Sequence, residues 1–137
     1  MIRSLSLCVL LVTAARAASA QDTPPRPPHP EPRVIVSVLS LAGPHERGEV
    51  ERHARLAWGK IVRCYKAIDR SARGSVTVEL AVHGSGTSSG ARRLGATLES
   101  RELSGCLTRI LNGLKMPKAR RTSFAKIEIR VAPGDPS

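Results

Sequence analysis

The residues best suited to chemistry are cysteines and histidines, and their spacing matches no known catalytic or metal-binding pattern. The histidines lie at positions 29, 45, 53 and 83. Their spacing from one another, and from the cysteines, is not that of a zinc site. No serine, histidine and aspartate can be assembled into a catalytic set from spacing alone. We therefore expect no metal, no cofactor and no enzyme activity.

A glycine-rich stretch, HGSGTSSG over residues 83–90, resembles a phosphate-binding loop only superficially. Its glycines, at positions 84, 86 and 90, do not give the G-x-G-x-x-G spacing, and no helix is expected directly after it. Short glycine-rich segments between alternating apolar runs are typical of hairpin turns. We therefore interpret this stretch as the turn of a β-hairpin.

The first twenty residues have the architecture of a secretory signal peptide. Arg3 precedes an apolar run over residues 5–14, and a small-residue site, Ala-Ser-Ala, ends at Ala20. That run is too short to span a bilayer stably. A buried or amphipathic N-terminal helix is the alternative. Cleavage after Ala20 predicts a periplasmic or secreted protein with no transmembrane span, and it removes Cys8.

Two cysteines, Cys64 and Cys106, would remain in the exported chain. An even pair in an oxidising compartment indicates one disulfide. Both cysteines also lie on apolar stripes of expected helices, where they are placed to join elements together. A metal site or a nucleophile is the alternative, which the export signal and the apolar surroundings disfavour.

The chain is strongly basic. Its formal net charge is +11, and loss of Arg3 and Arg16 with the signal peptide would leave 20 basic residues against 11 acidic ones, or +9. Nucleic acid is not an expected partner, because aromatic residues for base stacking make up only 2% of the chain and the protein is exported. The charge indicates either a solvated basic surface or an anionic envelope partner such as lipopolysaccharide or an acidic peptide.

Composition divides the chain into four parts. Residues 1–20 are the signal peptide, and residues 21–32 form a linker with six prolines between Pro24 and Pro32. Such a linker favours extended polyproline II and cannot contribute to a core. Residues 33–132 form one domain, and residues 133–137 are an expected disordered tail.

The hydrophobic pattern of the domain predicts an α+β fold, with two helices packed on a small, mostly antiparallel sheet of three to four strands. The first strand is nearly all apolar, so we expect it to be buried on both faces. Ser100 is a plausible N-terminal cap for the second helix. The expected elements begin with a strand over residues 34–41 and a helix over about 46–69. A hairpin follows, with a first strand over 76–82 and a second strand that ends at about residue 94. A helix over about 100–114 and a strand over 123–131 complete the domain.

This order, with a cysteine on each helix, resembles the AgmX/PglI C-terminal domain family, a relative of the TonB C-terminal domain. The resemblance covers about residues 46–132. It rests on a Cys-Tyr pair, a G-x-V-x-V strand, a second cysteine before an apolar run, and a proline after a bulky apolar residue. In this chain these are Cys64 and Tyr65; Gly74, Val76 and Val78; Cys106, Leu107, Ile110 and Leu111; and Met116 and Pro117.

The resemblance implies a non-enzymatic envelope protein that binds a partner segment by adding it to a sheet edge. The last strand alternates cleanly and is expected at or near such an edge. Its outward residues, Phe124, Lys126, Glu128 and Arg130, are the candidate partner-binding residues, since charges protect exposed edges. An interior strand with a wet face fits the pattern equally well. The second function class is a small basic exported protein that acts by charge at an anionic envelope surface.

Overall fold

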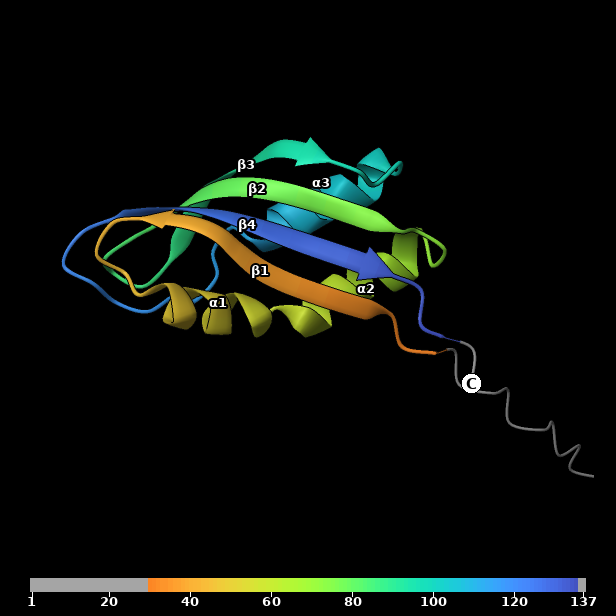
Figure 1. Ribbon diagram of the computed structural model, residues 1–137, viewed down its shortest axis with the longest axis horizontal. Coiled ribbons are helices and arrows are strands. Elements are labelled where there is room, and N and C mark those ends of the chain that lie inside the picture. Colours follow the sequence, from red (N-terminus) through yellow and green to blue (C-terminus); the bar gives the residue numbers. More distant parts are fainter. Residues whose placement is uncertain (1–29, 136–137) are drawn as a thin grey trace, which may run out of the picture.

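The computed structural model describes residues 30–135, which form an antiparallel sheet with its helices on one face (Figure 1). The sheet order is β1-β4-β2-β3, so the first and last strands of the chain are neighbours. The expected α+β class is confirmed, although three helices are present in these residues and not two. The elements are β1 (Arg33–Ala42), α1 (Arg47–Arg55), α2 (Trp58–Ile68), β2 (Gly74–Val82), β3 (Ser88–Ala96), α3 (Arg101–Ile110) and β4 (Ser123–Ala132).

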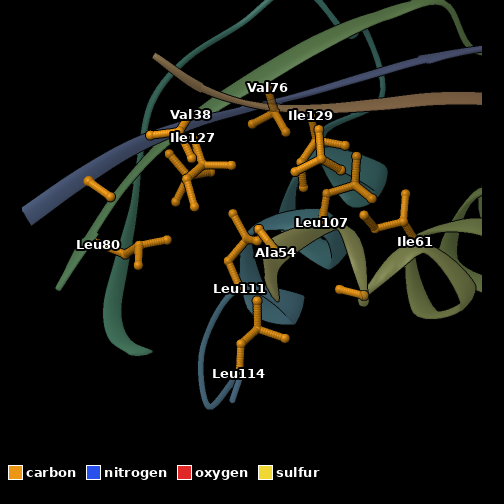
Figure 2. Close-up of a cluster of buried hydrophobic side chains, with 14 of the residues drawn as sticks. Val38, Ala54, Ile61, Val76, Leu80, Leu107, Leu111, Leu114, Ile127 and Ile129 are labelled. Atoms are coloured by element: carbon orange, nitrogen blue, oxygen red, sulfur yellow. The ribbon is translucent and has the colours of Figure 1, made fainter. Parts of the chain in front are cut away.

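The hydrophobic core lies between the sheet and the helices. Alternate residues of β2 and β4 point into it, as the period-two pattern predicts. Figure 2 shows Ile61, Leu107 and Leu111 lying beneath Ile127 and Ile129 of β4. All of these side chains are fully buried. The other face of the sheet carries no helix among the described residues and is open to solvent (Figure 1).

The long first helix expected over residues 46–69 is two helices. Helix α1 ends at Arg55, and α2 begins at Trp58 after a tight turn. In this turn the amides of Leu56 and Ala57 bond to carbonyls three residues earlier, at 3.1 Å each. The apolar stripe continues across the break, so periodicity alone gave no sign of it. The turn lets α1 follow β1 while α2 packs against α3.

Strand β1 is buried on one face only, which corrects the expectation that both faces are covered. Val36 and Val38 face the core, whereas Ile35 and Leu39 are 56% and 47% exposed. The reason is its position: β1 is an edge strand, and no layer covers the outer face of the sheet among residues 30–135.

The predicted hairpin is confirmed as β2 and β3, with two irregularities in the β3 register. Helix α3 is shorter than expected and ends at Ile110, before Gly113 takes a positive φ of 73°. The predicted cap is confirmed, because the Ser100 side chain accepts the Leu103 amide at 3.1 Å. Leu111 and Leu114, expected as the last helical turn, are buried beyond its end.

The two ends of the described chain lie side by side (Figure 1). Arg33, at the start of β1, pairs with the Asp135 carboxylate. The predicted signal peptide and the linker up to residue 29 lie outside the described residues, as do residues 136–137 of the predicted tail. Within residues 30–135, no helix is both long and apolar enough to cross a membrane.

Candidate functional site

The two cysteines of the described chain form a disulfide that joins α2 to α3. Their Cα atoms are 6.1 Å apart, and the residues are separated by 42 positions in the sequence. This distance is within the usual range for disulfides. Cys64 is buried on the apolar face of α2, as expected. The pair therefore connects two helices under the sheet and is not arranged as a reactive site.

The candidate residues of the last strand do not lie at a sheet edge. Strand β4 is paired with β1 on one side and with β2 on the other. Its backbone cannot accept a partner strand, so of the two alternatives left open by the sequence the interior strand with a solvent-exposed face is the one observed, next to the edge strand β1. Phe124, Lys126, Glu128 and Arg130 nevertheless point to the open face of the sheet, and Phe124 is 57% exposed. The four residues form a row across this face, with Arg130 and Glu128 paired at 3.1 Å.

Helix α1 closes the centre of the β1 edge with three side chains. The Val38 amide donates to the Glu51 carboxylate at 3.1 Å, and Arg47 donates to the Val38 carbonyl. Arg55 donates to the Val36 carbonyl at 3.4 Å and pairs with Glu51 at 2.5 Å. These bonds occupy backbone groups that an added strand would need. Sequence analysis missed this closure, although Arg47, Glu51 and Arg55 recur every four residues along one helix face.

The closure leaves two short segments of β1, residues 33–35 and residues 39–42. The first lies beside Trp58, which is 45% exposed and lines a shallow cavity with Val34, Ile35 and Arg55. Each segment is shorter than the typical strand length of about 5–6 residues. The β1 edge is therefore a poor acceptor for an extended partner.

The chain following α3 closes the first half of β3, the other edge of the sheet. The Ser88 amide donates to the Leu114 carbonyl at 3.2 Å, and the Gly113 amide donates to the Ser88 carbonyl at 2.8 Å. The Ala91 amide donates to the Asn112 side chain, also at 2.8 Å. These contacts fix the start of β3 against the end of α3 and exclude other partners there.

The second half of β3, residues 92–96, is exposed along its whole length, and we refer to it as the free β3 edge. Within residues 30–135, the backbone of this segment is paired with β2, and no covering loop or side chain forms a hydrogen bond with it. Arg92 pairs with Glu79 at 3.5 Å, whereas Arg93 has no acidic side chain within ion-pair distance in the described chain. The free β3 edge therefore combines available backbone groups with positive charge.

A buried serine–histidine pair is structural. The Ser123 hydroxyl lies 2.6 Å from Nδ1 of His45 and accepts the His45 backbone amide at 3.1 Å. Ser123 is fully buried, so no substrate reaches its oxygen. Gly43 packs so closely that a Cβ there would lie 2.3 Å from this hydroxyl. The pair fastens the loop after β1 to the start of β4.

The pKa values that shift belong to groups at helix ends. Hydrogen bonds from Ser71 lower the pKa of Asp69, which follows the last residue of α2. Burial raises the pKa of Tyr65, and the nearby Asp69 carboxylate raises it further. The Tyr65 hydroxyl is 2.7 Å from the Arg70 carbonyl, to which it donates. These contacts close the turn between α2 and β2.

Alkaline pH should destabilise the folded protein through Tyr65. Because the folded-state pKa is raised, the folded protein holds this proton more tightly than the unfolded chain does. The stabilisation is complete below the unfolded pKa of about 10 and is lost as the pH rises above it. Tyr65 is the only tyrosine, so phenolate absorbance reports it alone. We expect the phenolate to form at a higher pH in the folded protein than in the urea-unfolded chain, and the free energy of unfolding to fall over that pH range. Ionisation at the same pH in both states would contradict this assignment.

Within the described residues, no three histidine, cysteine or acidic side chains are grouped so that they could hold a metal ion. Comparisons with protein-family models, curated proteins and solved structures found no match to this chain. The fold is thus an α+β domain with a disulfide and an open sheet face, and its candidate site is the free β3 edge.

Proposed function

We propose that the chain is an exported, non-enzymatic protein-binding module that adds an extended partner segment to its sheet at the free β3 edge. The observation that carries the proposal is the unequal protection of the edges. Side chains of α1 close the centre of β1, and the segment after α3 closes the start of β3. Residues 92–96 are the longest uncovered edge segment in the described chain.

The chemistry of this edge favours an acidic partner segment. Arg92 and Arg93 are both exposed, and the net charge of the chain is positive. Charged residues on an edge restrict indiscriminate pairing, so an incoming strand with carboxylates is favoured over a neutral or basic one. Leu94, which follows them in the strand and is 42% exposed, offers an apolar contact beside them. Backbone bonds would supply affinity and the arginines would supply selectivity.

Export and the envelope location rest on two further observations. The predicted signal peptide directs the chain out of the cytoplasm. The Cys64–Cys106 disulfide supports this location, because such bonds persist in oxidising compartments. The resemblance of residues 46–132 to AgmX/PglI and TonB C-terminal domains supports strand addition as the binding mode.

Charge reversal at Arg93 tests the proposal. Arg93→Glu should lower the affinity for an acidic partner segment by about tenfold, because a like charge then faces the carboxylates of the segment. Arg63→Glu, an equal charge change on the exposed face of α2, is the matched control and should bind as the wild type does. Envelope proteins retained by the wild type and the control, but lost by Arg93→Glu, would supply candidate segments as synthetic peptides.

Hydrogen exchange with such a peptide then locates the binding site. Amides in residues 92–96 that are not bonded to β2 should exchange slowly only when the peptide is bound. Protection that appears instead in residues 33–35, beside Trp58, would place the partner on β1 and contradict the proposal. Equal binding by the Arg93→Glu and Arg63→Glu variants would also contradict it.

A further inference from the structure

A second surface of the protein carries a concentration of positive charge. Between Glu102 and Glu128 the chain contains six basic residues and no acidic one. Four of them lie in residues 115–121, which we call the cationic loop. None of the four takes part in the ion pairs of residues 30–135. The six basic residues are Arg109, Lys115, Lys118, Arg120, Arg121 and Lys126.

The backbone of the cationic loop is fixed against the turn of the β2–β3 hairpin. The Met116 amide donates to the Gly86 carbonyl at 2.9 Å, and the Ala119 amide donates to the Gly84 carbonyl at 3.1 Å. The approach is so close that a Cβ on Gly84 would lie 2.5 Å from the Ala119 carbonyl oxygen. The loop is therefore held in place before it meets a partner, which lowers the entropy lost on binding.

The cationic loop lies at one end of the molecule, and the two ends of the described chain lie at the opposite end (Figure 1). Lys115, Lys118, Arg120 and Arg121 are all exposed there. A planar surface with many phosphates can contact several of these cations at once. A single small anion on this exposed segment would contact fewer of them.

Apolar surface lies beside these charges. Lys115 lines a shallow cavity of about 370 Å³ together with Lys60, Leu56 and Leu114. Leu56, in the turn between α1 and α2, is 75% exposed and is the most exposed large apolar residue of the described chain. Basic side chains around an exposed apolar one match the boundary between lipid headgroups and acyl chains.

We propose that the cationic loop, with Lys60 and Leu56 beside it, docks the protein onto a bilayer surface rich in anionic phospholipids. Lipid phosphates contact the ammonium and guanidinium groups, and Leu56 enters the headgroup boundary. The charge complementarity does not involve the free β3 edge. The surface therefore places the module at a membrane and leaves the proposed partner site available.

Vesicle co-sedimentation tests this surface with the full exported chain. The probe is vesicles of phosphatidylcholine and phosphatidylglycerol in equal parts, at low and at high salt. Each basic residue near an anionic surface contributes roughly fivefold to partitioning. The triple variant Lys118→Gln, Arg120→Gln and Arg121→Gln should therefore bind about 100-fold more weakly than the wild type. Binding by the wild type should fall steeply with salt.

The matched control has the same net charge and leaves the cationic loop intact. It replaces Arg63, Arg73 and Arg101 with glutamine, three exposed residues outside the ion pairs of the described chain. We expect it to retain nearly all vesicle binding. Both triple variants should remain folded, since they change exposed side chains only, and circular dichroism checks this.

Three results would overturn the proposal. Equal losses in the two triple variants would mean that net charge, and not the cationic loop, governs binding. Binding to vesicles of phosphatidylcholine alone that equals binding to the mixed vesicles would show that anionic lipid is not required. Absence of wild-type binding at low salt, with binding retained to a soluble acidic polymer, would assign the cationic loop to a polymer. None of these results bears on the β3 proposal, because the assay contains no partner peptide.

Discussion

Reduction of the Cys64–Cys106 disulfide should lower the free energy of unfolding by about 4 kcal/mol. The bond closes a loop with a sequence separation of 42 residues, and opening it returns that conformational freedom to the unfolded chain. The loss is large for a domain of this size, whose total stability is on the order of 5–15 kcal/mol. It is also specific to the packing of α2 against α3, since the bond connects these two helices.

The measurement is urea unfolding with and without reductant, in a Cys8→Ser background that leaves this pair alone. The matched control carries Cys64→Ala and Cys106→Ala together. Its free energy of unfolding should already be as low as that of the reduced protein and should not change when reductant is added. Intact mass before and after reduction reports whether the bond is present in protein isolated from cells. Wild-type stability that does not change with reductant would contradict the structural role of the disulfide.

Local patterns were sufficient for the elements that carry most of the core. The alternation of β2 and β4 places Val76, Val78, Ile127 and Ile129 on one face, and all four are buried. The stripes of α2 and α3 likewise place Cys64 and Cys106 on the sides where these helices approach each other. These features depend on residues close in sequence, and their periodicity follows directly from backbone geometry.

Sheet order could not be predicted in the same way. Strand β1 pairs with β4, which lies about ninety positions later in the chain, and no local pattern reports such a pairing. The alternation of β4, with charged outward residues, is the same for an edge strand and for an interior strand with a wet face. Because β1 pairs beside β4, β4 is an interior strand, and the edge strands of the sheet are β1 and β3.

The closure of the β1 edge also depends on tertiary contacts. Arg47, Glu51 and Arg55 look like a solvated face of an amphipathic helix, because their partners are backbone groups of a strand that precedes them. Their four-residue spacing indicates a common face but not what that face meets. Sequence reasoning therefore indicates a common helix face at these positions, whereas what that face contacts, and which sheet edge is left uncovered, required the structure.

Replacement of Ile127 by alanine should be among the most damaging truncations on β4, at about 3 kcal/mol of unfolding free energy. Ile127 is fully buried, and its neighbours across the sheet are Val38 on β1 and Val78 on β2. Removal of its side chain leaves a cavity at the centre of the core, between two strands whose pairing prevents collapse.

The adjacent residue gives the matched control. Lys126 lies on the open face of the same strand, so Lys126→Ala should change the unfolding free energy by no more than about 0.5 kcal/mol. Urea unfolding of both variants, compared with the wild type at equal m-value, measures the difference directly. Equal losses of unfolding free energy in the two variants would mean that Ile127 does not face the core while Lys126 faces solvent. A stable Lys126→Ala variant would show that open-face residues can be changed without loss of the fold, which allows their contribution to binding to be measured separately from stability.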